Sequence, residues 1–465
     1  MTASRTIGLV GLGTMGRSLA LNFRDRGVAV LGYDPGEPAR RAAADAGLAL
    51  AADPAGLVAG LPPPRCILLM VPAGPAVDAA LDELSRHLAP GDVVIDGGNS
   101  HWRDSERRAA RLAAAGLAFV GAGISGGEEG ARFGPAIMIG AEPEAFARVQ
   151  PLFEAVAARA EDGTPCWAHF GPPPAGHLVK TVHNGIEYAI MQALAEVYDL
   201  ARRGHGLELK AIADLFESWQ EGPCGGFLLE TGIRVLRTRD PETGRPLLGF
   251  VRDRAEQKGT GGWTAIEALE LGVPAPTLVE AVQARSLSAV AVRAEFARLV
   301  PRPAATGPVG RPEDLEGALL ATLLAAHAQG LAILAESRRA RGWPGPPAAI
   351  PRVWRAGCIL RGNLLAPIVR AFERDPELPF SLLDDELLAL LLSGLADLRT
   401  AVADAARAGV PVPALSASLA WLDGLSSPRL PADLVQAMRD RFGAHGFERI
   451  DRPGRFHDLW RGARA

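Results

Sequence analysis

The feature that most constrains the fold is a glycine-rich turn between a predicted strand, residues 6–10, and a predicted helix, residues 15–26. Glycines at the first, third and sixth positions of this turn allow a tight bend, a close approach of backbone to a pyrophosphate, and close packing of helix on strand. The N–H groups at the helix N-terminus then face the anion. The pattern predicts a dinucleotide-binding domain whose cofactor contacts include Gly11, Leu12, Gly13, Thr14, Met15 and Gly16.

An acidic residue, Asp34, follows the second predicted strand, residues 28–33. A carboxylate at this position accepts hydrogen bonds from a ribose 2′-hydroxyl and repels a 2′-phosphate. The sequence therefore favours NAD as the cofactor, with NADP as the alternative. Two other interpretations stay open: Asp34 is a solvated turn residue, or Arg40 or Arg41 reaches a 2′-phosphate.

Short apolar runs alternate with helix-like segments over the first third of the chain. Further buried strands are predicted at residues 66–71, 93–96 and 118–120, because continuous apolar runs suit strands that are covered on both faces. Strands separated by helices favour a doubly wound parallel sheet. We therefore expect a Rossmann-like domain over residues 1–175, in which Val71, Pro72, Ala73 and Asn99 also contact the cofactor.

The pattern changes after the Pro-rich segment 171–174, where strand patterns nearly vanish. Apolar residues with a period of 3.6 predict helices at residues 179–202, 209–219, 277–299, 315–341 and 384–407. An all-helical domain is expected over residues 176–432, with loops at 301–312 and 342–351. Residues 433–465 form a C-terminal tail, whose last part is either a frayed end or an arm that docks elsewhere.

Composition argues against several classes of protein. A net charge of −4 gives no basic face for nucleic acid or for a membrane surface. The four cysteines form no CxxC pair, which fits a reducing cytoplasm, and residues 1–6 lack the apolar stretch expected of a signal peptide. The uncharged stretch 317–335 is the only candidate membrane span. Because His327 and Gln329 lie at its centre, a buried helix is the simpler interpretation.

Polar side chains gather on one face of the first helix of the second domain. Lys180, His183, Asn184 and Glu187 are spaced i, i+3, i+4 and i+7, and the opposite positions are apolar. A solvated helix face is the ordinary explanation of such a stripe. Its place directly after the nucleotide fold favours a substrate site instead. Two further segments support such a site. The strand end 96–100 places side chains at the carboxyl edge of the sheet. The glycine-rich segment 123–130 offers backbone N–H groups to an anion, or is an ordinary flexible turn.

Taken together, these segments resemble the 6-phosphogluconate dehydrogenases of the β-hydroxyacid dehydrogenase superfamily. The similar stretches follow the family's order across almost the whole chain. They are IDGGNS (95–100), VGAGISGGEEGARFGPAIM (120–138), GHLVKTVHNGIEY (176–188), QKGTGGWTAIEALELGVP (257–274), GCILRGNLL (357–365) and FGAH (442–445).

The resemblance implies oxidation and decarboxylation of 6-phosphogluconate to ribulose 5-phosphate, within the pentose phosphate pathway and gluconate utilization. It implies that Lys180 is the general base at the C3 hydroxyl and that Glu187 protonates the enediol at C1, with no metal. Carboxylate and hydroxyl contacts are implied for Asn99, Ser125, Gly126, Gly127, His183 and Asn184. Phosphate contacts are implied for Tyr188, Lys258, Thr260, Arg285, Arg439 and His445, the last two from the tail of the partner in a homodimer.

The chain departs from the family at three places. Asp34-Pro35-Gly36 replaces the Asn-Arg-Thr run that usually meets the 2′-phosphate, which again favours NAD. Residues 221–226 replace a more polar segment, and Gly262 stands where Lys is usual, which leaves sugar-acid affinity open. Two other classes of function are weighed against this one. They are a non-decarboxylating hydroxyacid dehydrogenase for an unphosphorylated substrate, and a catalytically silent nucleotide binder, which would have no reason to keep both Lys180 and Glu187.

Overall fold

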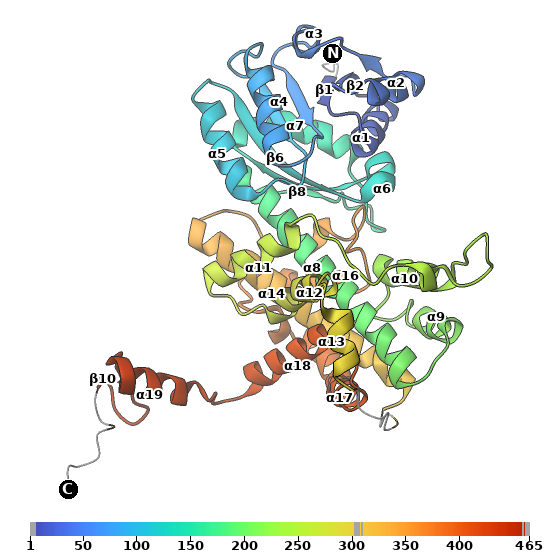
Figure 1. Cartoon of the computed structure of the whole chain (residues 1–465). Helices are drawn as coiled ribbons and strands as arrows, with labels where there is room; N and C mark the ends of the chain where they lie inside the picture. Colours follow the sequence, from blue (N-terminus) through green and yellow to red (C-terminus); the bar gives the residue numbers. More distant parts are fainter. Residues whose placement is uncertain (1–5, 302–306, 308–309, 458–459, 461–465) are drawn as a thin grey trace. The chain divides into compact units, whose positions relative to one another are not determined.

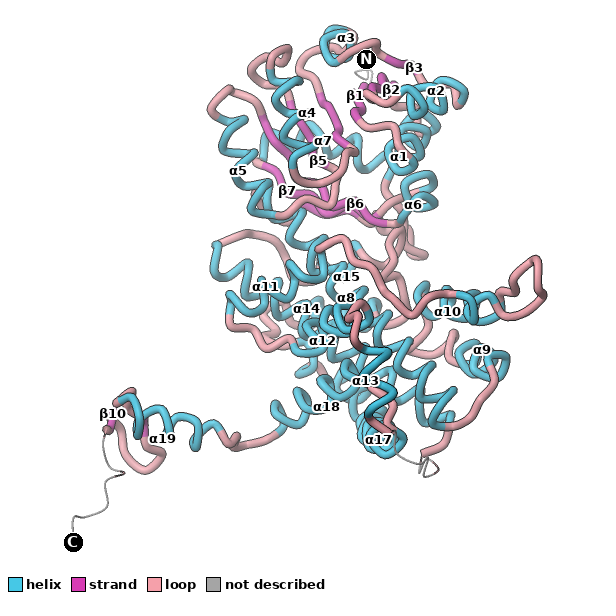
Figure 2. The backbone as a smooth tube through the Cα atoms, viewed as in Figure 1, coloured by secondary structure: helices cyan, strands magenta, loops and turns pink. Residues whose placement is uncertain are grey.

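The computed structural model describes residues 6–301, 307, 310–457 and 460. The chain divides into two compact units, Met1–Ser418 and Leu419–Ala465, which are considered separately. Within the first unit a sheet domain is followed by a helical domain (Figures 1 and 2).

The sheet has the strand order β3-β2-β1-β4-β5-β6-β7-β8. Its strands are β1 Thr6–Val10, β2 Ala29–Tyr33, β3 Ala49–Leu50, β4 Cys66–Leu69, β5 Val93–Asp96, β6 Ala118–Ser125, β7 Ala136–Ala141 and β8 Trp167–His169. Its helices are α1 Thr14–Asp25, α2 Glu37–Asp45, α3 Pro54–Ala59, α4 Pro75–Ser85, α5 Trp102–Ala113, α6 Gly127–Phe133 and α7 Pro143–Val156. One buried apolar cluster joins the strands to α1 and α7, and a second joins them to α3, α4 and α5. The predicted Rossmann-like fold is confirmed.

The sequence prediction differs from the structure at β6 and β7. Strand β6 continues to Ser125 and pairs with β7 in antiparallel orientation, within an otherwise parallel sheet. The glycine-rich segment 123–130 is therefore not one loop: its first residues end β6, and Gly127 begins the short helix α6. Small residues in β6 concealed the strand because strand predictions depend on apolar and β-branched side chains.

The helical domain confirms the second part of the predicted fold class. Its helices are α8 Pro173–Asp199, α9 Leu209–Ser218, α10 Phe227–Arg237, α11 Thr260–Leu271, α12 Pro276–Ser288, α13 Arg293–Leu299, α14 Leu315–Arg341, α15 Ala349–Val353, α16 Leu365–Arg374 and α17 Asp385–Ala408. The predicted helix 277–299 is broken into α12 and α13, and the predicted loop 342–351 contains the first turn of α15. Part of the predicted loop 301–312 lies outside the described residues.

Helix α14 contains the uncharged stretch of the sequence. The segment Pro312–Arg341 is long and apolar enough to cross a membrane, but 89% of its most apolar window is buried within the structure. Buried positions His327 and Gln329 lie in the same helix, and Gln329 exchanges hydrogen bonds with Thr277 of α12. Packing inside the helical domain accounts for its hydrophobicity.

Helix α8 begins against the sheet and continues into the helical domain (Figure 1). A Cβ atom on Gly176 would lie 2.2 Å from the carbonyl oxygen of Gly121 and 2.5 Å from that of Met138. Only glycine therefore allows the first turns of α8 to lie this close to β6 and β7. This contact places the next turn of α8 beside the carboxyl end of β6.

The second unit has a local fold of its own. Helix α18, Pro413–Ser426, crosses the boundary between the units and is followed by α19, Ala432–Gly443, and by an antiparallel pair, β9 Phe447–Glu448 and β10 Arg455–Phe456. The buried carboxylate of Asp440 accepts hydrogen bonds from Gly446 N, His457 Nδ1 and Trp460 Nε1, at 2.7–2.8 Å. The described part of this segment is therefore folded rather than frayed.

Candidate active site

The glycine-rich turn connects β1 to α1 as predicted. A Cβ atom on Gly16 would lie 1.8 Å from the carbonyl oxygen of Gly11, whereas nothing lies within 4 Å of one on the exposed Gly13. The close approach of Gly16 to Gly11 brings helix and strand together. The open space around Gly13 leaves the turn accessible to a ligand. A cleft of about 540 Å³ adjoins the turn and is lined by the ends of β1, β2 and β4 and by one face of α4. These features fit a dinucleotide whose pyrophosphate lies at the N-terminus of α1.

Asp34 lies in this cleft with a fixed carboxylate. Its Oδ2 accepts a hydrogen bond from Leu12 N and its Oδ1 accepts one from Gly36 N, both at 2.7 Å. The side chain of Leu12 is fully buried, so this predicted contact supports the turn and does not face the cleft. Arg40 Nη1 donates to the carbonyl oxygens of Asp34 and Pro35, at 2.8 and 2.9 Å.

The predicted contacts after β4 and β5 lie at the carboxyl edge of the sheet. Val71 and Pro72 line the cleft, whereas Ala73 is exposed beyond it. After β5, Asp96 accepts hydrogen bonds from Gly98 N at 3.0 Å and from Ser100 Oγ at 2.7 Å, and Asn99 is left exposed. Arg108, which the sequence did not single out, is fully buried and pairs with Asp96 at 3.3 Å.

Lys180 is the centre of a buried polar cluster on α8. Its Nζ donates to Asn184 Oδ1 at 2.7 Å and to Ser125 Oγ, at the end of β6, at 2.9 Å. His183 Nδ1 lies 3.0 Å from Asn184 Oδ1. The Lys180 side chain is only 6% exposed. The predicted helix face is therefore not a solvated one, and the structure brings Ser125, Lys180, His183 and Asn184 together.

Burial changes the proton affinity of the titratable groups in this cluster. It lowers the pKa of Lys180 to about 8, although the charge of Glu187 acts in the opposite direction. It also lowers the pKa of His183 well below the usual value, and the charge of Lys180 lowers it further. An amine with such a pKa exchanges protons readily near neutral pH.

Glu187 lies about two helical turns beyond Lys180 and is partly buried. Burial raises its pKa, and the positive charges of Lys180 and Arg285 offset this only in part. The next residue, Tyr188, is buried, and the guanidinium of Arg285 from α12 lies 3.4 Å from its ring centroid. Glu187, Tyr188 and Arg285 thus extend the Lys180 cluster along α8.

The other implied phosphate contacts divide between two places. A Cβ atom on Gly261 would lie 2.4 Å from the Tyr188 ring, so the first turn of α11, with Thr260, packs against Tyr188. Lys258 lies in the exposed loop before α11. Arg439 and His445 belong to the second unit: Arg439 lies on α19, where its Nη1 donates to Gln436 Oε1 at 3.0 Å, and His445 follows the helix.

The sequence assigned no role to the segment around Trp354 and Cys358. The Trp354 ring packs edge-on against His183, with 5.6 Å between centroids, and Cys358 is buried near Lys180, where burial raises the pKa of its thiol to about 12. The carbonyl oxygen of Gly357 would lie 2.5 Å from a Cβ atom on Gly126. Gly357 and Cys358, the first two residues of the stretch 357–365, therefore pack against the site. The similarity of this stretch to the family was the one feature of the sequence that pointed to it.

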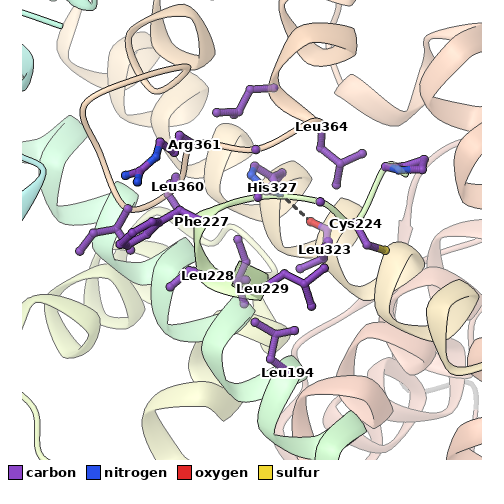
Figure 3. A pocket seen from close by; sticks show the side chains of 17 residues that line it. Leu194, Cys224, Phe227, Leu228, Leu229, Leu323, His327, Leu360, Arg361 and Leu364 are labelled. Carbon is purple, nitrogen blue, oxygen red and sulfur yellow. Dashed lines mark hydrogen bonds between the residues drawn. The ribbon is translucent and has the colours of Figure 1, made fainter. Parts of the chain in front are cut away.

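The unusual segment 221–226 contributes to a small cavity of about 40 Å³ (Figure 3). Apolar side chains from α8, α10, α14 and the loop before α16 line it, and Cys224 and His327 are among its few polar side chains. His327 Nδ1 lies 2.8 Å from the carbonyl oxygen of Leu323, which makes Nδ1 the donor. On α8 the cavity contacts Ile190 and Leu194, which follow Lys180 and Glu187 in the chain. The departure at 221–226 thus leaves the Lys180 cluster intact.

Comparison with known proteins decides the family. Residues 6–171 match the model of the NAD binding domain of 6-phosphogluconate dehydrogenase, and residues 176–460 match that of its C-terminal domain. The chain belongs to the 6-phosphogluconate dehydrogenase family. It is therefore an oxidoreductase with a nicotinamide dinucleotide as cofactor, as the sequence predicted.

Relatives and a solved structure cover nearly the whole chain. The decarboxylating 6-phosphogluconate dehydrogenase of Cunninghamella elegans is 41% identical over 98% of this chain and 96% of its own length. The NADP(+)-dependent, decarboxylating enzyme of Bacillus subtilis is 39% identical over 98% and 99%. The structure of the Plasmodium falciparum enzyme, known with its cofactor NADP+ and its substrate 6-phosphogluconate, has a TM-score of 0.94 at 33% identity and covers 98% of this chain and 100% of that one.

Proposed function

We propose that this chain oxidises and decarboxylates 6-phosphogluconate to ribulose 5-phosphate and carbon dioxide, with Lys180 as general base and Glu187 as general acid. The observation that carries the proposal is the pair itself. The amine and the carboxyl group share one face of α8, and burial moves the pKa of Lys180 down to about 8 and that of Glu187 up. Two groups whose pKa values are moved in these directions suit a base and an acid at neutral pH.

The proposed chemistry uses the neutral form of Lys180 first. Its Nζ accepts the proton of the C3 hydroxyl as C3 is oxidised to a ketone. The resulting β-keto acid loses carbon dioxide, and the electrons of the broken C–C bond move onto the ketone oxygen. The Lys180 ammonium, now formed, stabilises this enolate oxygen. Glu187 then donates its proton to C1 of this enolate, which is an enediolate because C1 carries a hydroxyl group. The enolate oxygen becomes the ketone oxygen of ribulose 5-phosphate, and no metal is needed.

The substrate contacts follow from the two parts of the cluster. Ser125, His183 and Asn184 already surround Lys180 Nζ and, with Asn99, Gly126 and Gly127, are proposed to hold the carboxylate and hydroxyl groups. Tyr188, Thr260, Lys258 and Arg285 are proposed to hold the phosphate, since Arg285 lies on the Tyr188 ring and Thr260 begins the helix packed against it. Arginine and lysine bind a dianion through charge-assisted hydrogen bonds.

We propose NAD as the preferred cofactor, held by the Gly11–Gly16 turn and by Asp34. When bound, the nicotinamide takes up the hydride that leaves C3. The charged side chains that line the cleft are Asp34 and Glu83, both acidic, which disfavours the extra phosphate of NADP. The Bacillus subtilis and Plasmodium falciparum enzymes use NADP+ by name, so this preference would separate the chain from those relatives.

Replacing Asp34 by alanine tests the cofactor proposal. We expect the ratio of kcat/KM with NAD to kcat/KM with NADP to exceed one in the wild-type enzyme and to fall about tenfold or more in Asp34→Ala, because a charged hydrogen bond to ribose and a repulsion are both removed. Asp45→Ala, an exposed acid at the end of α2 that does not line the cleft, is the matched control. An unchanged ratio in Asp34→Ala would show that another residue selects the cofactor.

We also propose a homodimer in which Arg439 and His445 complete the phosphate site of the partner. Helix α19 exposes Leu434, Met438 and Phe442, which is unusual for a helix that has no partner. Complementation tests this: Lys180→Ala and the double variant Arg439→Ala/His445→Ala each keep only a small residual rate alone, but a one-to-one mixture refolded together is expected to regain roughly a quarter of the wild-type rate from hybrid dimers. A mixture with no gain in activity, or an active monomer by sedimentation, would contradict tail exchange.

We place the enzyme in the cytoplasm, in the pentose phosphate pathway and gluconate utilization. The four cysteines are free thiols, which fits a reducing compartment.

A further inference from the structure

A buried carboxylate, Glu267, joins the nucleotide domain to the helical domain. It lies on α11 and is 1% exposed. Its Oε2 accepts a hydrogen bond from Trp102 Nε1, at the first residue of α5, at 3.1 Å. Its Oε1 accepts one from Ser337 Oγ at 3.2 Å and pairs with Arg341 at 2.7 Å, both from α14. One side chain thus connects α5 of the sheet domain with two residues of the helical domain.

Both ends of this connection lie next to catalytic elements. Trp102 follows Asn99 by three residues, at the carboxyl end of β5, which faces the cofactor in folds of this kind. Helix α11 packs on α8, because Thr264 Oγ1 donates to the carbonyl oxygen of Thr181 at 2.8 Å, and a Cβ atom on Gly185 would lie 2.5 Å from the Thr264 side chain. Glu267 therefore connects the turn after β5 with the turn of α8 that carries Lys180.

The Trp102 ring is held in one position. The guanidinium of Arg341 lies 4.2 Å from the centroid of the ring and that of Arg103 lies 4.5 Å from it. The His101 ring, in turn, contacts Trp263 of α11 edge-on, with 4.9 Å between centroids. The contacts with Arg341 and Trp263, which belong to the helical domain, restrict the sideways movement of the start of α5, and the hydrogen bond to Glu267 fixes its distance from α11.

We propose that Glu267 is a positioning residue that, through Trp102, sets the distance between the cofactor-facing end of β5 and the catalytic helix α8. The inference rests on the proposed role of Lys180 at C3. Hydride transfer requires its reacting atoms within about 3–3.5 Å, and a displacement of 1 Å costs about 10²-fold in rate. A loosened connection between the two domains therefore slows hydride transfer while the groups that bind the sugar acid stay in place.

The experiment compares two variants that each remove one uncharged hydrogen-bond donor to the same carboxylate. Trp102→Phe removes the hydrogen bond to Glu267 that joins the two domains, and it keeps an aromatic ring beside the two guanidinium groups. Ser337→Ala removes the hydrogen bond to Glu267 that lies inside the helical domain. With 6-phosphogluconate deuterated at C3, we expect Trp102→Phe to lower kcat about tenfold and to raise the deuterium isotope effect on kcat, because hydride transfer becomes more limiting. KM for 6-phosphogluconate is expected to stay near the wild-type value, and Ser337→Ala to leave both quantities unchanged.

A second control uses the surface of the same interface. Arg103 and Glu270 form an exposed pair between α5 and α11, so Glu270→Gln is expected to resemble the wild type. Equal effects in Trp102→Phe and Ser337→Ala, no effect in either, or a lower kcat without a larger isotope effect would each overturn the positioning role. Absence of turnover in the wild-type enzyme would contradict the proposed function as well, whereas wild-type turnover without an effect in Trp102→Phe contradicts only this inference.

Discussion

Lys180→Ala is expected to lower kcat for 6-phosphogluconate oxidation by about 10²–10⁴-fold or more. The proton of the C3 hydroxyl then has no acceptor at the position of Nζ, and the enolate oxygen loses its positive partner. The amine is held by Ser125 Oγ and Asn184 Oδ1 at 2.9 and 2.7 Å, and neither a hydroxyl group nor an amide is a base that could take its place. Steady-state rates with both cofactors, together with carbon dioxide release, measure the effect.

Two further measurements make the Lys180 result specific. Lys210→Ala removes an exposed lysine on α9 that pairs with Asp214, and it is expected to leave kcat unchanged. Lys180→Ala is expected to bind the cofactor with unchanged affinity, measured by the quenching of protein fluorescence. The reason is that the cleft at β1 and β2 does not include α8. Turnover of Lys180→Ala within a few-fold of the wild type would remove Lys180 from the chemistry.

Glu187→Gln is expected to lower kcat by about 10²-fold. The amide has nearly the shape of the carboxyl group but cannot donate the proton that C1 of the enediol requires. The product formed in deuterated water measures this step directly. In the wild-type enzyme a positioned acid places deuterium on one face of C1, whereas in Glu187→Gln the solvent protonates both faces and the two epimers appear together.

Glu196→Gln is the matched control for Glu187. Glu196 lies on the same helix and is buried, but its carboxylate accepts hydrogen bonds from Ala414 N and Leu415 N at the start of α18, both at 2.9 Å. Its replacement is expected to lower stability and to leave the stereochemistry at C1 unchanged. Stereospecific labelling by Glu187→Gln would show that another group is the acid.

Local sequence patterns predicted a helix or strand correctly where its apolar pattern matches the surroundings that it has in the fold. The strands β1 and β5 and the helix α14 begin and end at the predicted residues. The failures have local causes. Small residues hid the second half of β6, and an apolar periodicity that continues through residues 289–292 hid the break between α12 and α13.

The candidate site was predictable only in part. The spacing of Lys180, His183, Asn184 and Glu187 placed them on one face, but whether that face was buried depended on β6, which supplies Ser125 from 55 positions earlier in the chain. The same limit applies to Trp354 and to the connection from Trp102 to Glu267, because contacts between distant segments follow from packing rather than from local spacing. The resemblance to a family supplied the roles that residue patterns alone left open.

The pH dependence of kcat/KM for 6-phosphogluconate tests the central claim most directly. Since kcat/KM reports the groups of the free enzyme, and the base must be neutral, the value is expected to rise about tenfold per pH unit on the acidic side and to level off near the Lys180 pKa of about 8. The residual activity of Lys180→Ala should lack this rise. A wild-type profile that is flat from about pH 6 to about pH 9, or an identical rise in Lys180→Ala, would contradict a neutral Lys180 as the base.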